Sequence, residues 1–457
     1  MIEEARLRGE IAVVGLGRSG MAAARLLARD GARVYASDAG QGDEVTRAAA
    51  ELRGEGIAAD GGLHDMTRIR AASLVVVSPG VPPDALPLAT AREAGVPVVG
   101  EVEIALSALR GVPYIAITGT NGKSTVTALV AHLLAALGHR AAAAGNIGRA
   151  LSDVALQGER PEWIALEISS FQLHDTPSIA PVVGVLTNLS PDHLDRYHSV
   201  EAYYADKALM YRNATTASRW VVCADDRRAL DLGLGTPGTR WAFSRLDQHA
   251  AAHYEAARDA LVVFGKPLAH RDTLPLLGWH NVDNVLAALL AVMLADKAHQ
   301  SKAARATLAA ALKTFRGLPH RLEVVADVAG VRWINDSKAT NVSSARVAIE
   351  AMSQPTVVLL GGKHKGEPYT ALIEPLRAHA TRVIAYGEAE SMIVTDLQGY
   401  VPLERCGSSF EKVMQRARAT ARPGDAVLLA PACSSFDMFT NYEARGETFR
   451  RLARGDA

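Results

Sequence analysis

The sequence feature that most constrains the fold is a short glycine-rich loop between an apolar segment and a helical one. The loop, Gly119-Thr120-Asn121-Gly122-Lys123-Ser124-Thr125, follows the apolar residues 114–117 and precedes the helix-like residues 126–137. A strand, a loop and a helix in this order bring backbone N–H groups and the positive end of the helix to one junction, where they can hold a triphosphate. Lys123 can reach the outer phosphate oxygens, and Ser124 can ligate Mg²⁺. The chain is therefore expected to bind and use ATP.

The phosphate loop is shorter than usual. The common pattern has a glycine five residues before Gly122, but Ile117 occupies that position. The motif is thus a G-x-x-G-K-S variant, which narrows the families that it can belong to. We take all seven loop residues as candidate ATP contacts: Gly119, Thr120, Asn121, Gly122, Lys123, Ser124 and Thr125.

Length and composition exclude several classes of protein. A chain of 457 residues suggests about three domains, and its 49 basic and 49 acidic residues give no reason to expect nucleic acid or a membrane surface as partner. The three cysteines are far apart and fit a reducing compartment. The N-terminal residues do not resemble a signal peptide, and the longest apolar run, residues 285–295, is too short to span a bilayer. We expect a soluble, cytoplasmic protein that acts on small molecules.

Apolar strand-like runs alternate with helix-like segments along the chain, which is typical of parallel α/β sheets. Three such series begin near residues 11, 114 and 332, and the boundaries between them fall near residue 105 and in Phe315-Arg316-Gly317-Leu318-Pro319. The predicted domains are residues 1–104, 105–317 and 318–457.

A second glycine motif lies in the first series. Gly15-Leu16-Gly17-Arg18-Ser19-Gly20 follows a predicted strand, and Asp38 closes the next one. Taken alone, this G-x-G-x-x-G pattern predicts an NAD-binding oxidoreductase. The same backbone can approach any pyrophosphate, so a UDP group would fit equally well, and a tight packing turn is the third interpretation. The loop Ser78-Pro79-Gly80-Val81-Pro82 also follows a strand and is expected at the same rim of that sheet, unless it is a plain turn.

The central series carries further polar residues at strand ends. Glu167 ends the apolar run that starts at Trp163, the position from which phosphate-loop domains supply a magnesium ligand. His193 lies in a polar cluster, residues 187–197, after another strand, and we favour a metal or phosphate role for it over that of a solvated residue. Lys207 alone suggests only a solvated lysine on a helix.

Together these motifs resemble those of the Mur ligases, and the resemblance covers essentially the whole chain. It rests on the phosphate loop, on Glu167-Ile168-Ser169-Ser170-Phe171-Gln172 and on residues 188–197. Trp333-Ile334-Asn335-Asp336-Ser337-Lys338-Ala339-Thr340-Asn341 and Pro431-Ala432-Cys433-Ser434-Ser435-Phe436-Asp437-Met438-Phe439 look like the glutamate-adding branch of the family, whereas the D-N-P-R motif of the diaminopimelate-adding relatives is absent. The resemblance implies a Rossmann-like N-terminal domain that binds UDP, a central P-loop ATPase domain and a Rossmann-like C-terminal domain.

The resemblance also implies roles for individual residues, including two Mg²⁺ ions and a carbamate on Lys207. UDP-substrate contacts would be Arg18, Ser19, Asp38, Gly80, Asn146 and His193. Further ATP contacts would be Asn284, Arg321 and Asp336. Glutamate contacts would be Lys338, Thr340, Lys365, Ser435 and Tyr442. Metal ligands would be Ser124, Glu167, His193 and carbamylated Lys207. Catalytic residues would be Lys123, His193, Lys207 and Lys338.

The implied reaction is the addition of glutamate to UDP-N-acetylmuramoyl-L-alanine through an acyl phosphate, by a monomer that uses ATP. D-glutamate is the expected substrate, and an L-glutamate-adding variant is the alternative within the family. The C-terminal domain is expected to swing about hinges near residues 105 and 317. The rival interpretations outside the family are the nucleotide-binding oxidoreductase and a non-catalytic P-loop regulator.

Overall fold

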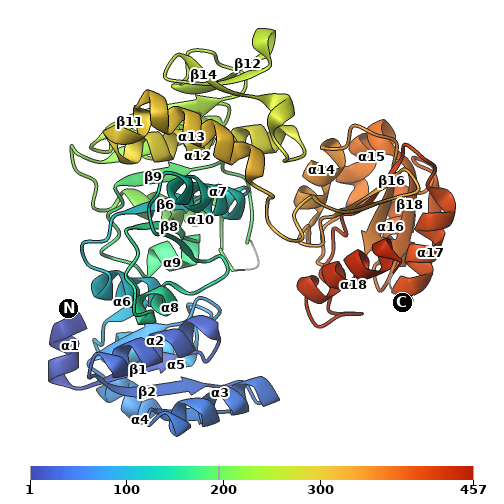
Figure 1. Ribbon diagram of the computed structural model, residues 1–457. Helices are drawn as coiled ribbons and strands as arrows, with labels where there is room; N and C mark the ends of the chain where they lie inside the picture. Colours follow the sequence, from blue (N-terminus) through green and yellow to red (C-terminus); the bar gives the residue numbers. More distant parts are fainter. Residues whose placement is uncertain (1, 194–195, 456–457) are drawn as a thin grey trace. The chain divides into compact units, whose positions relative to one another are not determined.

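The computed structural model describes residues 2–193 and 196–455 (Figure 1). Its contacts divide the chain into two compact units, Met1–Thr273 with Asp283–Lys313 and Leu274–Val282 with Thr314–Ala457. Each unit has its own sheets and its own hydrophobic core, so the two are described separately.

The first unit begins with a five-stranded parallel sheet of order β3-β2-β1-β4-β5. Successive strand residues face opposite sides, so Val13 and Val76 pack under α2, α3 and α6, while Val14 and Val75 pack under α4 and α5. Both faces are buried, which explains the almost uninterrupted apolar runs in the sequence. The elements are β1 Glu10–Val14, β2 Arg33–Asp38, β3 Ala58–Gly61, β4 Leu74–Val77 and β5 Val98–Gly100, with α1 Ile2–Arg8, α2 Arg18–Arg29, α3 Asp43–Gly54, α4 Met66–Ala71, α5 Leu86–Glu93 and α6 Glu101–Ala108.

The same unit holds a nine-stranded sheet of order β14-β13-β12-β11-β10-β9-β6-β8-β7. It is parallel from β7 to β12, and β13 and β14 continue it as antiparallel strands. The strands are β6 Tyr114–Thr118, β7 Ala141–Gly145, β8 Trp163–Glu167, β9 Val183–Leu186, β10 Arg219–Cys223, β11 Thr239–Ser244, β12 Ala252–Glu255, β13 Ala260–Val263 and β14 Lys266–His270. The helices are α7 Lys123–Ala136, α8 Leu151–Leu156, α9 Ser170–His174, α10 Val200–Ala208, α11 Arg227–Asp231, α12 Trp279–Ala295 and α13 Lys302–Thr314, with the 3₁₀ turns η1 Leu209–Tyr211, η2 Ala256–Arg258, η3 Arg271–Thr273 and η4 Lys297–Gln300.

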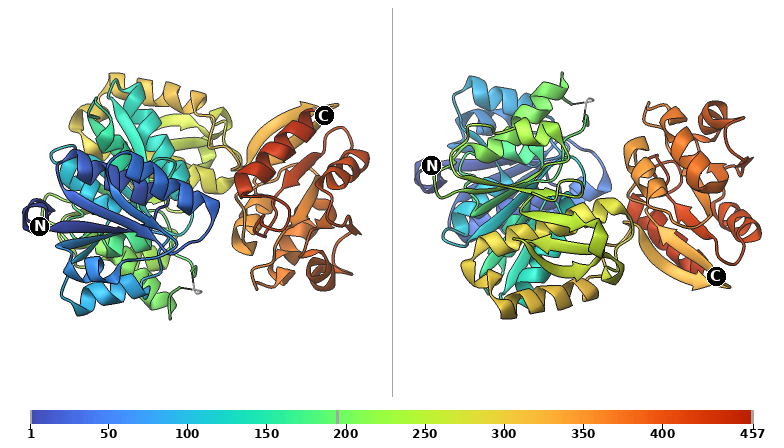
Figure 2. Two further views of the ribbon diagram at one scale, coloured as in Figure 1. Left: turned by 90° about the horizontal axis from the view of Figure 1, so that it is seen from below. Right: turned by 90° about the horizontal axis from the view of Figure 1, so that it is seen from above.

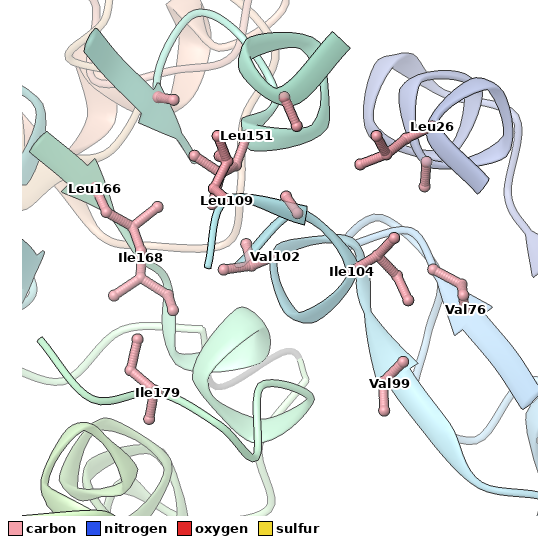
Figure 3. Packing of buried hydrophobic residues seen from close by; sticks show 14 of the residues in the cluster. Leu26, Val76, Val99, Val102, Ile104, Leu109, Leu151, Leu166, Ile168 and Ile179 are labelled. Carbon is pink, nitrogen blue, oxygen red and sulfur yellow. The ribbon is translucent and has the colours of Figure 1, made fainter. Parts of the chain in front are cut away.

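One hydrophobic cluster joins these two sheets through α6. Figure 3 shows Ile104 of α6 on the side of Val76 and Val99, and Val102 toward Leu166. The hinge expected near residue 105 is wrong, because Ala105 is fully buried in the middle of α6 and belongs to this shared core.

The second unit contains a six-stranded sheet of order β15-β16-β20-β17-β18-β19, parallel except for β15 at its edge. One face packs against α14, α15 and α16 and the other against α17 and α18 (Figures 1 and 2). The elements are β15 Glu323–Val328, β16 Val331–Asn335, β17 Thr356–Gly361, β18 Ala380–Tyr386, β19 Leu403–Arg405 and β20 Ala426–Leu429, with α14 Val342–Glu350, α15 Ile373–His379, α16 Glu390–Leu397, α17 Phe410–Thr420, α18 Tyr442–Arg454 and the 3₁₀ turn η5 Tyr369–Leu372.

Most of the parallel strands lie where the apolar runs predicted them, whereas several other strands were not predicted. The strands without a prediction are the parallel β3, β7, β10, β11 and β19, β12 at the change of direction, and the antiparallel β13, β14 and β15. In the part of the chain that the structure describes, no helix has the length and apolar character needed to cross a membrane.

Candidate active site

The phosphate loop joins β6 to α7, and two of its glycines have backbone conformations that other residues rarely adopt. Gly119 has φ of 138° and Gly122 has φ of 83°. A Cβ atom on Gly119 would lie 2.0 Å from Thr187 Oγ1, and one on Gly122 would lie 2.3 Å from Asn284 Oδ1. Both glycines are therefore required by close neighbours as well as by conformation. The second contact also brings Asn284, a predicted ATP residue on α12, against the loop.

The first half of the phosphate loop is hydrogen-bonded to the segment that follows β9. Asn188 accepts from two loop amides, from Thr120 N with its backbone oxygen (2.9 Å) and from Asn121 N with its side-chain oxygen (2.9 Å). The Asn188 amide nitrogen donates to Asn121 O (3.0 Å), and Thr187 Oγ1 donates to the same carbonyl (2.7 Å). Thr120 Oγ1 accepts from Ser190 N and donates to Ser190 O, both at 3.0 Å. The amides of Thr120 and Asn121 are thus already bonded within the protein.

Lys123 and Lys207 meet at one carbonyl oxygen. Lys123 Nζ donates to Gly119 O (3.0 Å) and Thr120 O (2.8 Å), and Lys207 Nζ donates to Gly119 O (2.7 Å). Lys207 is 1% exposed, so the interpretation as a solvated lysine is wrong. Helix α10 directs it inward, where its Nζ lies 4.5 Å from the centre of the Tyr203 ring. Burial, with a smaller contribution from the Lys123 charge, holds the pKa of Lys207 well below its usual value.

Glu167 ends β8 beside the start of the phosphate loop, because β6 and β8 are neighbours and Ile117 pairs with Glu167. Its Oε1 accepts from the Asn146 side-chain amide (2.8 Å). Its Oε2 is buried and has no hydrogen-bond partner among the residues that the structure describes. An orphaned carboxylate oxygen next to a phosphate loop fits a ligand for a hard cation such as Mg²⁺. The contact also places Asn146 beside the predicted metal ligand.

Within residues 2–193 and 196–455, no group of three His, Cys, Asp or Glu side chains lies so that it could hold a metal ion. The set of predicted metal ligands does not require such a group of three side chains. It draws on the hydroxyl of Ser124, a single carboxylate, His193 and a modified Lys207, with phosphate oxygens and water expected to complete the coordination.

His193 lies in the loop before α10 with a φ of 55°, which is uncommon for a residue other than glycine. Its ring packs edge-on against Phe171 and Tyr203, with centroids 5.2 and 5.9 Å apart. Its Nε2 lies 3.7 Å from Asp192 Oδ2. Since the ring of Tyr203 also contacts Lys207, one aromatic side chain links the two residues predicted to hold the second metal ion.

Four of the six residues predicted to bind the UDP substrate lie at the carboxyl ends of β1, β2 and β4, whereas Asn146 and His193 follow β7 and β9. Asp38 accepts from Leu16 N and Gly40 N, both at 2.8 Å, and so holds the first glycine motif in place. A Cβ atom on Gly20 would lie 1.8 Å from Gly15 O, which shows that this glycine serves close packing of α2 on β1. Arg18 and Ser19 begin α2, and Gly80 is exposed in the loop after β4. The Arg18 guanidinium also donates to Gly148 O, which follows Asn146 by two residues.

In the second unit, the predicted ATP residues Arg321 and Asp336 are electrostatic neighbours. Asp336 follows β16 and accepts from Leu322 N (3.2 Å). Burial raises the pKa of Asp336 to about 7, and the positive charge of Arg321 opposes part of this rise.

The predicted glutamate residues form two pairs on the second unit. Lys338 Nζ donates to Tyr442 OH (3.2 Å), and Lys365 Nζ donates to Thr340 Oγ1 (3.4 Å). Ser435 is buried in the loop after β20. The fully buried Arg445 organises this region, because it donates to Ser337 Oγ and O and to the carbonyls of residues 433 and 434.

Sequence reasoning missed several residues that shape the site. Tyr203 was not singled out, although its spacing of four residues from Lys207 on a helix places both on one face. The spacing of Arg445 from Ser337 gives no such signal, because the two residues are 108 positions apart. Asn188 was recognised only as part of a motif.

Comparisons with known proteins agree over the whole length of the chain. Three family models match: the N-terminal domain of MurD-like Mur ligases at residues 9–100, the Mur ligase middle domain at 117–292 and the Mur ligase glutamate ligase domain at 320–433. The chain belongs to the Mur ligase family. The predicted α/β architecture with three Mur ligase domains is thereby confirmed.

Family relatives and solved structures extend this similarity. The UDP-N-acetylmuramoylalanine–D-glutamate ligase of Acidobacterium capsulatum is 40% identical, covering 98% of this chain and 96% of the relative. The enzyme of the same name from Myxococcus xanthus is 39% identical, covering 97% of each chain. Two Mur-type structures share the fold: the UDP-N-acetylmuramate–alanine ligase of Thermotoga maritima (TM-score 0.61, 20% identity, 98% and 100% covered) and a pseudomurein peptide ligase of Methanothermus fervidus (0.60, 17%, 98% and 100%). A nicotinamide-dependent oxidoreductase is not favoured by these matches.

Proposed function

We propose that this protein is an ATP-dependent ligase that adds D-glutamate to UDP-N-acetylmuramoyl-L-alanine in peptidoglycan precursor synthesis. One observation carries the proposal: a phosphate loop with a buried carboxylate and a buried lysine beside it, in a chain that matches D-glutamate ligases at 40% identity over nearly its full length. The preference for D-glutamate over the alternative L-glutamate rests on the names of those relatives.

The proposed reaction has two steps. The terminal carboxylate of UDP-N-acetylmuramoyl-L-alanine attacks the γ-phosphorus of ATP, which breaks the bond to ADP and forms an acyl phosphate. The amine of glutamate then attacks the acyl carbon, a proton leaves the nitrogen, and inorganic phosphate departs as the amide forms. Neither step requires a covalent bond to the protein, so the side chains act by positioning and by neutralising charge.

Lys123 and the N-terminus of α7 are the proposed binding group for the transferred phosphoryl group. Ser124 and Glu167 would hold one Mg²⁺ ion, and His193 and Lys207 would hold a second. When bound, these ions would neutralise negative charge on the phosphate groups. The fit is supported by the unpartnered Oε2 of Glu167. A free ammonium cannot ligate a cation, so Lys207 must first become a carbamate.

The environment of Lys207 favours that modification. Carbamate formation requires a neutral amine that attacks carbon dioxide and releases a proton. The low pKa of the buried Lys207 makes the neutral amine more abundant than in an exposed lysine. The neighbouring Lys123 charge, which disfavours a Lys207 ammonium, would attract a carbamate instead.

Two further groups of residues are proposed to bind the UDP substrate and glutamate. Arg18, Ser19, Asp38, Gly80, Asn146 and His193 are proposed to bind the UDP substrate, and all lie in the first unit. Lys338, Thr340, Lys365, Ser435 and Tyr442 are proposed to bind glutamate, and all lie in the second. Lys338 and Lys365 carry two positive charges, which suit the two carboxylates of glutamate. We propose that the protein acts as a monomer.

A phosphate-release assay tests this function. Purified protein receives Mg²⁺, ATP and UDP-N-acetylmuramoyl-L-alanine, and either D- or L-glutamate. We expect phosphate to appear together with a new amide product, identified by mass, with D-glutamate only. Phosphate release with L-glutamate but not with D-glutamate would support the L-glutamate-adding variant. Nucleotide binding without any amide product would support a non-catalytic regulator instead.

A further inference from the structure

We propose that Asn188 is a positioning residue for phosphoryl transfer. Its hydrogen bonds fix Thr120 and Asn121, in the first half of the phosphate loop, to the segment that carries His193. This inference rests on the proposed function for its catalytic part. Asn188 has no role in the site as assigned above, and its side chain bonds to the protein backbone.

The contact is a two-point clamp on a single residue. The Asn188 side-chain oxygen accepts from Asn121 N at 2.9 Å, and its amide nitrogen donates to Asn121 O at 3.0 Å. Asn188 O accepts from Thr120 N at 2.9 Å. A side-chain amide that pairs with both polar groups of one peptide residue reproduces the pairing of neighbouring strands and fixes that residue in position.

The clamp decides which amides can bind phosphate. A backbone N–H donates one hydrogen bond well, and those of Thr120 and Asn121 already donate to Asn188. The phosphates are therefore bound by the amides from Gly122 onward, at the N-terminal turn of α7, with help from the Lys123 side chain. Thr120 and Asn121 shape the loop and do not bind phosphate through these amides.

The clamp also ties the loop to the proposed metal site. Asn188 precedes His193 by five residues, and the intervening segment is anchored on the other side because Leu189 N donates to Asp226 Oδ2 (2.6 Å). Asp226 in turn caps α11 through the amides of Arg228 and Ala229. A shift of the phosphate loop would thus be transmitted through hydrogen bonds to residues 188–190, and from there along three residues of chain to His193.

The test compares Asn188→Leu and Asn188→Ala with a matched control. Leucine keeps the volume but removes both side-chain bonds, and alanine removes them without any possible clash. Asn213→Leu is the control, because Asn213 also donates to two backbone carbonyls, those of Pro177 and Ile179, outside the phosphate loop. Affinity for a non-hydrolysable ATP analogue with Mg²⁺ is measured by calorimetry, and kcat and the KM for each substrate are measured in the coupled assay.

We expect both Asn188 variants to weaken nucleotide binding roughly tenfold and to lower kcat by a similar factor, since two hydrogen bonds are lost. The KM for the UDP substrate should rise less than the KM for ATP, because five of its six predicted contact residues lie outside the segment that Asn188 holds and only His193 lies on it. Unchanged nucleotide affinity, or an equal rise in all three KM values, would overturn the proposal. So would equal losses in Asn213→Leu.

A double-mutant cycle gives an independent check. Thr187 Oγ1 and the Asn188 amide both donate to Asn121 O. The combined Thr187→Val and Asn188→Leu variant should therefore lose less affinity than the product of the single losses, and a strictly multiplicative loss would count against a shared clamp. Nucleotide binding does not depend on ligase chemistry, so these measurements remain decisive even if the wild-type protein forms no amide.

Discussion

Lys207 shows how far a single residue can differ from what its sequence context suggests. A lysine in the segment Tyr203-Tyr204-Ala205-Asp206-Lys207 is normally exposed, yet here it is buried and bonded to Gly119 O. The neighbour that makes this possible is 88 residues away in the sequence. Residue type alone could not predict the burial, because it depends on where α10 packs against the phosphate loop.

The carbamate on Lys207 predicts a specific pattern of chemical rescue. Lys207→Ala should lose activity, and bicarbonate or short carboxylic acids should partly restore it by placing a carboxylate in the vacated space. Lys207→Met is the matched control, because its side chain fills that space and leaves no room for the acid. Turnover is measured over a range of acid concentrations. Full activity of either variant without additives would show that no carbamate is needed.

Lys123→Ala should slow turnover roughly tenfold to a hundredfold. The variant loses a charge-assisted hydrogen bond to the migrating phosphoryl group, worth about 1.5 to 3 kcal/mol. Single-turnover measurement at saturating ATP separates this effect from weaker binding. Arg18→Ala, in the predicted UDP site, is the comparison, and it should change the KM for the UDP substrate more than the rate of the phosphoryl step. Near wild-type turnover of Lys123→Ala would contradict the proposed role.

At the scale of elements, most parallel strands were predicted from the sequence, whereas the antiparallel β13, β14 and β15 were not. A strand that is buried on both faces, such as β8, has an almost uninterrupted run of apolar residues in its sequence. The edge strand β14 has the sequence Lys266-Pro267-Leu268-Ala269-His270 and is largely exposed, so it lacks both that run and a clear alternation. The position of the candidate metal ligand Glu167, at the end of a parallel strand, followed from the same apolar run.

Helix α6 is the element whose role the sequence concealed. It looked like a boundary, but it carries two buried carboxylates that bond to the central domain. Glu101 Oε1 accepts from Ser152 N near the start of α8, and Glu103 accepts from Ser178 N (3.0 Å) and Oγ (2.7 Å). These contacts, with the shared apolar cluster, make the first two sheets one compact unit.

Glu101 makes the stability of this unit dependent on pH. Burial raises the pKa of Glu101 from 4.5 to about 7, so between these values the native state holds a proton that the unfolded chain has lost. Ionisation therefore favours unfolding, and this contribution to stability is lost as the pH rises toward and through 7. Glu101→Gln cannot ionise and keeps an oxygen for Ser152 N. Relative to wild type, it should gain up to about 3 kcal/mol in unfolding free energy between pH 5 and pH 8.

Denaturant unfolding at both pH values measures this difference. Glu55→Gln is a suitable control, since Glu55 is a more exposed carboxylate that is paired with Arg25. The pKa of Glu55 is lowered by this pairing, whereas that of Glu101 is raised. Because the pKa of Glu55 is lowered from 4.5, its contribution to stability changes only as the pH falls toward and below 4.5, so the effect of Glu55→Gln should be nearly the same at pH 5 and pH 8. A Glu101→Gln variant whose stability relative to wild type is the same at pH 5 and pH 8 would show that Glu101 remains ionised in the native state.

At the scale of the whole molecule, the compact units do not coincide with the three domains of the family. The first unit includes two of them, and the chain passes between the units at 273/274, 282/283 and 313/314. The predicted ATP residues are divided between the units, with Asn284 in the first and Arg321 and Asp336 in the second. Sequence motifs could assign these residues to one ligand, but they carry no information on how independently the units fold.

This division predicts how ATP affects unfolding. Two units with separate cores should give two calorimetric transitions. If residues of both units contact ATP, a non-hydrolysable analogue with Mg²⁺ should raise both transition temperatures, with about 2.7 kcal/mol of stabilisation shared between them at one hundred times Kd. Asp336→Asn, which keeps an acceptor for Leu322 N, should abolish the shift of the second-unit transition only. Asp425→Asn, which changes a turn carboxylate of the same unit, should leave both shifts intact. If the nucleotide analogue does not change the transition temperature of the second unit in the wild-type protein, Arg321 and Asp336 do not belong to the ATP site.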